Sequence, residues 1–478
     1  MLSLFRNKFH SFRGDANQDS RRRRAMSAGS DPRTRPLRLA YRRPEFLQQT
    51  PAELRASTDT SVRPIVEPKH VNALPLKAGY AECTNAGKSD FNEDQAAAGE
   101  IILTSKPVSG QENQPDASIR SSSLRVVYYG LFDGHAGTGA ALMAANQLII
   151  HLQEKLVEIK DDVFHYARGG KIPILMPSTV TVDSLVTGAL EAAFFAMDQQ
   201  IERESKLFNI SGGCTALLAL FFLGKLYVAN AGDCRAVIYF GDQVKPVSTE
   251  FTPEQEAQRI QYLGFLRPDL LGKNYTYNCF ARHLSRKDIG KKVLCRGPMN
   301  NGWHFKEITE DDVKPQLITG EGKRARLMGT IGVSRGFGDH SLLAHGDETR
   351  IKPFLSCIPE VQVFDLGEHQ LTEDDVLVMG SDGLWDMTTS EKIGSLVKKT
   401  LATRSLSELD DRIYTRVARA VIQHSRGESV SGGWLQDCGR EASFDDISAF
   451  VIPLNETYQV SQLKFQGSQE LKEAVENE

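Results

Sequence analysis

Short apolar runs and stretches of helical periodicity occur in separate blocks along the chain. The apolar runs predict strands at residues 124–132, 215–222, 226–231, 235–240, 376–380 and 447–452. Apolar positions at helical spacing predict helices over residues 140–156 and 185–202. This grouping of strands with strands and helices with helices favours antiparallel sheets covered by helices, an α+β fold, over a strictly alternating parallel sheet.

The three runs between residues 215 and 240 follow one another closely. A Gly224-Lys225 turn separates TALLALFF from LYVANA, and RAVIYF comes soon afterwards. Short connections between apolar runs are typical of strands that pair with their neighbours in sequence. The spacing therefore predicts a consecutive antiparallel meander.

Both ends of the chain differ in composition from its middle. Prolines at positions 32, 36, 44, 51 and 64 break any periodic pattern in residues 1–65, so we predict a basic, disordered tail and linker there. We expect order to begin near Gly79, one folded domain to span residues 66–455, and a polar tail to occupy residues 456–478.

Two polar segments interrupt that domain. Residues 105–123 are rich in Ser, Gln and Pro and predict a flexible loop. Residues 252–325 begin as an amphipathic helix, FTPEQEAQRIQYLGFL, and then run irregularly, with a basic cluster at Arg282, Arg286, Lys287, Lys291 and Lys292. A long insertion of this kind is usually functional or disordered, and its charges usually form a solvated surface.

Composition and charge narrow the class of protein. The net charge of −4 hides a basic start with an arginine run at residues 21–24, usually a disordered tail, with contact to an anionic membrane as the alternative. The start, MLSLFRNKFHSF, lacks the apolar core of a signal peptide, and no stretch is apolar enough to span a membrane. Seven cysteines without CxxC spacing indicate reduced thiols. We therefore predict an intracellular protein, cytoplasmic or nuclear, without a transmembrane segment or a nucleic-acid partner.

Acidic residues recur where apolar strands meet turns. Asp133, Asp233 and Asp382 each follow an apolar run, Asp445-Asp446 precede another, and Glu93-Asp94 form a further pair. A single Asp after a strand is usually a turn former or a helix cap. Several such groups beside buried strands would repel one another and cost desolvation unless a cation held them.

The absence of a Cys/His cluster narrows the choice of cation. A site made only of oxygen ligands suits magnesium or manganese rather than zinc or copper. Two such ions about 4 Å apart can bridge a water, lower its pKa and clamp a phosphoryl group for in-line attack. A lone loop histidine is more often a surface residue, but His135, two residues after Asp133, could act beside such ions as a general acid.

Two glycine-rich segments could suggest nucleotide binding. Gly87-Lys88-Ser89 ends like a phosphate-binding loop, but the first glycine of that motif would fall at Glu82. The glycines of DGHAGTG are not spaced as GxGxxG. A nucleotide-binding regulator is therefore disfavoured, and since no cysteine lies in a CX5R loop, so is a tyrosine-phosphatase mechanism.

A series of motifs resembles one enzyme family in order and spacing. NEDQA, LFDGHAG, SGGCTALLAL, LYVANAGDCRAV, TIGVSRGFGD, GSDGLWD and FDDISAFVI are similar to the motifs of the metal-dependent protein serine/threonine phosphatases, the protein phosphatase 2C family. The resemblance spans roughly residues 79–454 and, through NAGKS, NEDQA and EFTPE, is strongest to the branch labelled H, J and M. It implies a central sandwich of two antiparallel β-sheets flanked by helices, in four layers αββα, with a binuclear metal site at one edge.

The resemblance also implies roles for individual residues. The metal-binding set would be Glu93, Asp94, Asp133, Gly134, Asp233, Asp382, Asp386 and Asp445. In this set Asp133 bridges two Mn²⁺ or Mg²⁺ ions, Gly134 contributes its carbonyl oxygen, and Asp94 supports metal-bound water from behind the ligands. Asp233 and Asp386, together with Asp382, match the acids of a weaker third site. His135 matches the proposed general acid.

The chain departs from the family pattern beside the predicted phosphate site. Ser89 stands where the family usually has a phosphate-binding Arg, four residues before Glu93, and the adjacent Lys88 is a point charge without the fork of Arg. Cys234 and Asp446 replace a usual Ser and Asn without removing a ligand.

These residues predict a phosphoprotein phosphatase that hydrolyses phosphoserine or phosphothreonine in one step, without a phosphoenzyme. A metal-bridging hydroxide held by Asp133 attacks phosphorus, Lys88 orients the phosphate and His135 protonates the leaving oxygen. Phosphorylated Ser/Thr proteins are the expected partners, and branch resemblance alone suggests phosphorylated Rab-type GTPases. The alternative is a pseudophosphatase or phosphoprotein-binding scaffold that uses the insertion, the variable flap of the family, a hypothesis that Ser89 keeps open.

Overall fold

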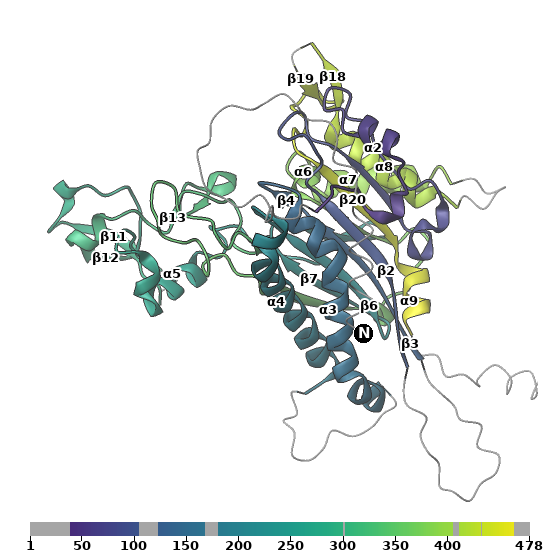
Figure 1. Ribbon diagram of the computed structural model, residues 1–478, viewed down its shortest axis with the longest axis horizontal. Helices are drawn as coiled ribbons and strands as arrows, with labels where there is room; N and C mark the ends of the chain where they lie inside the picture. Colours follow the sequence, from purple (N-terminus) through teal and green to yellow (C-terminus); the bar gives the residue numbers. More distant parts are fainter. Residues whose placement is uncertain are drawn as a thin grey trace, which may run out of the picture.

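Two five-stranded antiparallel sheets form the centre of the protein (Figure 1). The computed structural model describes residues 39–104, 123–167, 180–299, 302–404, 411–431 and 433–462. The first sheet has the order β16 (Glu360–Asp365), β7 (Lys225–Ala231), β6 (Ala216–Phe222), β3 (Ser123–Phe132), β2 (Gln95–Thr104). The second has the order β1 (Gly79–Cys83), β20 (Ile447–Pro453), β17 (Val376–Gly380), β8 (Arg235–Phe240), β9 (Gln243–Pro246).

Helices cover the outer faces of both sheets. The long helices α3 (Gly139–Ala167) and α4 (Val182–Phe208) pack on the first sheet, and α7 (Ser390–Leu401) and α8 (Ile413–Arg426) pack on the second (Figure 1). Between the sheets lies a third apolar layer in which the rings of Tyr129 and Phe450 meet edge to face at 5.6 Å. Strands buried on both faces need continuous apolar runs, which explains the sequence of β6 and β20. The predicted four-layer αββα sandwich is confirmed.

The predicted meander is wrong at its third strand. β6 and β7 form the expected hairpin, but β8 leaves that sheet and pairs with β17 in the other. A buried strand has the same local pattern in either sheet, so periodicity could not reveal this crossing. The crossing places Asp233, in the connection between β7 and β8, where the two sheets meet.

The first described residues form an arm that packs against the domain rather than a linker. This N-terminal arm, residues 39–66, contains η1 (Glu45–Leu47) and α2 (Pro51–Ser57), a helix that begins at a Thr50 capping box. Leu47 lies in the core between the sheets, and Arg43 and Arg63 are buried. Order therefore begins well before Gly79, while the arginine run of the predicted tail lies outside the described residues.

The start of the predicted C-terminal tail is also part of the domain. The chain continues from β20 into α9 (Leu454–Ser461), in which Thr457 and Ser461 are fully buried. An amphipathic helix that covers the sheets, not a polar tail, thus occupies the first part of that segment. The rest of the tail and the loop predicted at residues 105–123 lie, apart from Ser123, outside the described residues.

The insertion has regular structure where irregular chain was predicted. Its helix α5 (Ala257–Leu266) starts only after a turn, and a small sheet follows, made of β10 (Cys279–Phe280), β11 (Lys292–Arg296) and β12 (His304–Glu307). The pair β13 (Ile318–Thr319) and β14 (Arg326–Leu327) ends it. The insertion has its own apolar clusters and projects from one side of the sandwich (Figure 1).

Shorter elements complete the described chain. Three two-residue strands, β4 (Gly134–His135), β5 (Gly213–Cys214) and β15 (Phe337–Gly338), form a small sheet, and β18 (Glu428–Val430) pairs with β19 (Gly433–Leu435). Helix α6 (Asp382–Trp385) follows β17 directly. The 3-10 helices besides η1 are η2 (Val71–Ala73), η3 (Pro75–Lys77), η4 (Pro268–Leu271), η5 (Arg286–Asp288), η6 (Glu310–Val313), η7 (Gly322–Arg324) and η8 (Leu366–Glu368). Within the described ranges, no helix combines the length and apolar character needed to cross a bilayer.

Candidate metal centre

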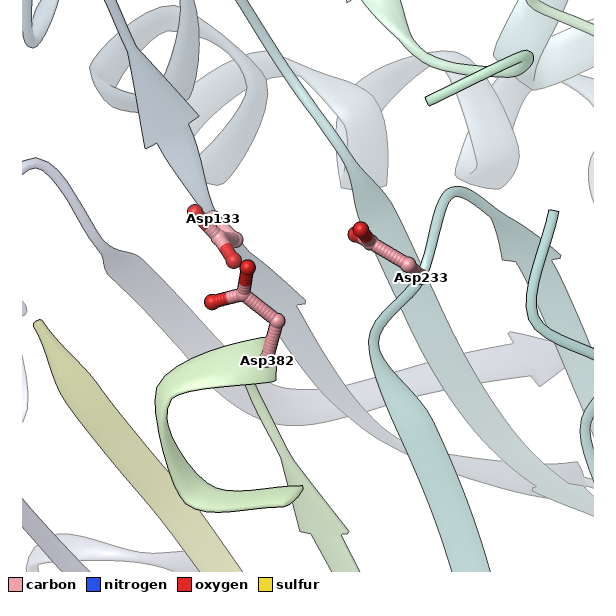
Figure 2. Close-up of side chains that lie close together, drawn as sticks. All are labelled: Asp133, Asp233 and Asp382. Carbon is pink, nitrogen blue, oxygen red and sulfur yellow. The ribbon is translucent and has the colours of Figure 1, made fainter. Parts of the chain in front are cut away.

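Three carboxylates from distant parts of the sequence converge at one edge of the sandwich. Asp133 follows β3, Asp233 lies in the connection between β7 and β8, and Asp382 opens α6 after β17. Oxygen atoms of the three side chains lie within 4.8 Å of one another. Figure 2 shows Asp133 and Asp382 pointing toward each other, with Asp233 facing them from a neighbouring strand end. Both sheets therefore contribute to one acidic cluster.

The cluster is electrostatically unfavourable without a cation. Burial, and then the negative charge of Asp382, raises the pKa of Asp133 well above its usual range, and the pKa of Asp233 is raised for the same two reasons. Burial and the nearby Asp445 raise the pKa of Asp382 to about 6. A divalent ion would remove this repulsion, and an all-oxygen donor set suits Mg²⁺ or Mn²⁺. The residues present therefore fit the metal that the sequence predicts.

The turn after Asp133 is held against the segment that carries Glu93. A Cβ atom on Gly134 would lie 2.4 Å from the carbonyl oxygen of Glu93, so only glycine permits this approach. The backbone N–H of Gly137 donates to Oε1 of Glu93 at 2.8 Å. Glu93 is thus fixed next to the turn that follows Asp133, although it is not among the three side chains that converge most tightly.

Asp446 also binds the segment that carries Glu93. Its Oδ2 accepts the backbone N–H of Glu93 at 2.9 Å, and its Oδ1 accepts the backbone N–H of Asn85 at 2.7 Å. A Cβ on Gly383 would lie 1.9 Å from the carbonyl oxygen of Asp446, which explains the glycine after Asp382. The acid at position 446 therefore holds the backbone beside Asp445 and Glu93 together.

Asp94 is buried next to the residue that precedes Asp382. Its side chain accepts a hydrogen bond from the Ser381 hydroxyl at 2.8 Å. Burial, and then the charges of Asp446 and Asp382, raises its pKa well above the usual range. Asp94 is therefore close enough to interact electrostatically with the cluster while its hydrogen bond fixes the residue before Asp382.

Lys88 reaches the cluster from the NAGKS loop. The side-chain oxygen of Asn85 accepts the backbone N–H groups of Gly87, Lys88 and Ser89 at 3.0, 2.7 and 3.1 Å, which fixes this loop. The ammonium of Lys88 lies 2.8 and 2.7 Å from the two carboxylate oxygens of Asp445. The structure thus brings together the predicted ligand Asp445 and the lysine beside the missing arginine.

His135 is oriented by a residue to which the sequence analysis gave no role. Its Nε2 lies 2.6 Å from Oδ2 of Asp339, and Asp339 is nearly buried. Asp339 has a left-handed backbone, with φ of 56°, and its N–H donates to the Gly212 carbonyl at 2.9 Å. Asp339 ends the segment TIGVSRGFGD, so its motif was visible, but its partner, 204 positions away, was not.

The insertion also reaches the acidic edge. Asp386, at the end of α6, is half exposed and pairs with Lys323 of η7, whose Nζ lies 2.8 Å from Oδ1. The same ammonium donates to the Asp386 carbonyl at 2.9 Å. The basic cluster predicted earlier in the insertion is partly neutralised within the insertion itself, because Arg282 and Lys291 both pair with Asp288.

The charge repulsion in the cluster predicts a pH effect on stability. We expect the metal-free wild-type protein to lose stability relative to an Asp382→Asn variant as pH rises from about 4 through about 6. The pKa of Asp382 is about 6 in the folded protein against an ordinary value of 3.8, so in this window the folded state binds more protons than the unfolded state. Stability then falls with rising pH. Urea unfolding of both proteins in EDTA measures the difference in their free energies of unfolding. If this difference stays constant, or changes in favour of the wild type as pH rises, the raised pKa of Asp382 is contradicted.

Comparison with protein families supports one match over much of the chain. The family model described as Protein phosphatase 2C matches residues 103–269 and 316–429. The gap in this match lies within the insertion. Asp133, Asp233, Asp382 and Asp386 fall inside the matched ranges, whereas Lys88, Glu93, Asp94 and Asp445 are on flanking segments.

Curated relatives extend the similarity to most of the chain. It is 42% identical over 481 residues to Protein phosphatase 1H of Xenopus tropicalis, covering 89% of this chain and 94% of that protein. It is 41% identical over 468 residues to Protein phosphatase 1J of Mus musculus, covering 91% and 90%. Among solved structures, the serine-threonine phosphatase 2C from Toxoplasma gondii aligns with a TM-score of 0.40 and 15% identity, covering 82% of this chain and 99% of that chain.

Proposed function

The chain belongs to the protein phosphatase 2C family, a family of metal-dependent serine/threonine protein phosphatases, and on this premise we propose that it hydrolyses phosphoserine and phosphothreonine in one displacement by water. The observation that carries the proposal is the convergence of Asp133, Asp233 and Asp382 at one edge of the sandwich. Burial and neighbouring acids raise the pKa values of Asp133 and Asp382, and a cation would offset this unfavourable charge. The second hypothesis, a phosphoprotein-binding scaffold without activity, has no comparable observation in its favour.

The proposed metal ligands follow the sequence motifs. Asp133, Glu93, Asp382, Asp445 and the Gly134 carbonyl would hold two Mn²⁺ or Mg²⁺ ions, and Asp233 and Asp386 with Asp382 a weaker third. When bound, such ions supply an activated water nucleophile and neutralise charge on the phosphoryl oxygens.

The other side chains would bind the phosphate and move a proton. Lys88, held beside Asp445, would contact a phosphoryl oxygen as a point charge in place of the family's arginine. His135 would donate a proton to the departing serine or threonine oxygen. Asp339 holds the His135 ring in one orientation for this transfer.

The cysteines near the cluster do not suit a thiolate nucleophile. Cys214 and Cys234 are fully buried, and burial followed by nearby acids raises the pKa of both thiols well above the usual range. A reactive cysteine needs a lowered pKa and access to substrate. Direct attack by water, without a phosphoenzyme, is therefore the mechanism that we propose.

Narrower features of the function stay predictions. The expected substrates are phosphorylated Ser/Thr proteins. Rab-type GTPases as substrates, a cytoplasmic or nuclear location, and contact of the basic start with anionic membrane are hypotheses drawn from the sequence. Lys323 ties the insertion to Asp386, so the proposed substrate-selecting flap and the acidic edge are in contact.

The direct test is hydrolysis of a phosphothreonine peptide by the purified protein. We expect turnover with Mn²⁺ or Mg²⁺ and none in excess EDTA. Without a metal ion the acidic cluster has no positive charge with which to activate water or bind phosphate. Released phosphate measures the rate. Folded, metal-loaded protein that does not turn over would contradict the proposal and favour the scaffold hypothesis.

A further inference from the structure

A buried arginine of the N-terminal arm contacts the backbone of the segments that carry proposed metal ligands. The Arg63 side chain is fully buried, and its guanidinium donates three hydrogen bonds to backbone carbonyls. The Nε donates to Thr84 at 2.7 Å, Nη1 to Ser443 at 2.5 Å and Nη2 to Asp445 at 2.8 Å. All three carbonyls lie in the two segments that carry predicted metal ligands.

The hydrogen bonds of Arg63 connect these two segments to each other. Thr84 follows β1 and opens the loop that leads to Lys88 and Glu93. Ser443 and Asp445 precede β20, and Asp445 is the ligand whose own carbonyl Arg63 holds. A planar group with fixed donors that spans three acceptors restricts their relative positions more than a flexible ammonium can.

Arg63 is itself held in place. Its N–H donates to the Asp59 carbonyl at 2.8 Å, and its carbonyl accepts from Arg426 at 2.9 Å. Its guanidinium lies over the Trp434 ring, 5.2 Å from the centroid. The backbone of Arg63 is left-handed, with φ of 48°, a conformation that persists in a non-glycine residue only when its surroundings fix it.

We propose that Arg63 is a positioning residue that fixes Asp445 and the Glu93 loop, and that the N-terminal arm thereby sets the metal affinity of the centre. The inference rests on the proposed function, because it takes Asp445 and Glu93 as ligands. Arg63 contacts the carbonyl of Asp445 and so acts through the ligand backbone. Outer residues that orient metal ligands typically change metal affinity about 10–100-fold when they are replaced.

A second buried arginine of the arm provides a matched control. Arg43 is nearly as buried as Arg63, and its hydrogen bonds go to Ser57, Glu82 and the Thr84 side chain. Arg43→Lys can keep its pairing with Glu82 and its charge, as Arg63→Lys keeps the charge beneath Asp445. A general loss of packing in the arm would affect the two variants alike, whereas loss of ligand positioning would affect only Arg63→Lys.

The experiment is calorimetric titration of the full-length chain with Mn²⁺, without substrate, at a temperature where each variant is folded by circular dichroism. We expect Arg63→Lys to weaken Mn²⁺ binding by about 10-fold or more and Arg43→Lys to leave the affinity within about 2-fold of wild type. If Arg63→Lys does not fold, Trp434→Leu, which removes the stacking surface, should weaken binding in the same direction.

The two proposals fail in different ways. Mn²⁺ affinities that are equal in wild type and Arg63→Lys, or in wild type and Trp434→Leu where that variant replaces it, overturn the inference and leave the phosphatase proposal intact. Equal weakening in Arg63→Lys and Arg43→Lys also overturns it. A wild-type protein that binds Mn²⁺ but does not hydrolyse a phosphothreonine peptide overturns the proposed function, while the affinity difference still decides the role of Arg63.

Discussion

Replacing Asp382 with Asn is expected to abolish phosphatase activity and to make the metal-free protein more stable. Burial and the nearby acid Asp445 raise the pKa of Asp382, and burial and Asp382 raise that of Asp133, so ionisation of Asp382 destabilises the fold when no cation is present. Asn keeps the size of the side chain and removes one negative charge. The same change removes a proposed ligand, and losing several kcal/mol of metal stabilisation slows the reaction by about 1,000-fold or more.

The prediction differs from simple misfolding because the substitution should raise the metal-free stability while it lowers the activity. Thermal unfolding in EDTA measures the metal-free stability, and phosphate release from a phosphothreonine peptide with Mn²⁺ measures activity. A suitable control is Asp375→Asn: this buried acid accepts hydrogen bonds from Thr372 and Gly241, so its loss should lower stability and leave activity unchanged. An Asp382→Asn protein that is less stable in EDTA, or retains activity, contradicts the cluster as the metal site.

The layers of the fold could be predicted from the sequence because burial on both faces leaves an unmistakable local pattern. Continuous apolar runs marked β6, β7 and β20, and helical spacing marked α3 and α4. Which sheet a strand joins depends on contacts far away in sequence, so the crossing of β8 could not be predicted. Composition misled at the arm and at α9, where the short helices bury polar residues, Ser57 in α2 and Thr457 and Ser461 in α9.

The acids of the site could be predicted, but the groups that hold them could not. Asp133, Asp233 and Asp382 follow apolar strands, and strand ends that meet at one sheet edge bring such residues together. The bracing contacts are made by residues of ordinary local character, such as Arg63 in the arm and Lys323 in the insertion. Their roles depend on pairings across long stretches of chain, which one sequence does not encode in any local pattern.

Replacing His135 with Ala is expected to slow phosphothreonine hydrolysis by about 10²–10⁴-fold, the usual contribution of a general acid. An alkoxide is a poor leaving group and needs a proton as the bond to phosphorus breaks. The leaving group of an aryl phosphate is a stabilised phenolate, which needs no proton to depart. The same variant should therefore hydrolyse an aryl phosphate at close to the wild-type rate. Comparing kcat for a phosphothreonine peptide and an aryl phosphate, at saturating Mn²⁺, measures this difference, and an equal loss on both substrates counts against the role.

Asp339→Asn separates proton donation from ring orientation. The Asp339 carboxylate lies 2.6 Å from Nε2 of His135, so its loss should reproduce the preference for the aryl substrate in weaker form. Combined with His135→Ala, it should add little, because two residues that act as one unit are not additive. If Asp339→Asn instead slows both substrates equally, and does so in the His135→Ala background as well, the contact stabilises the turn after Asp133 rather than orienting a proton donor.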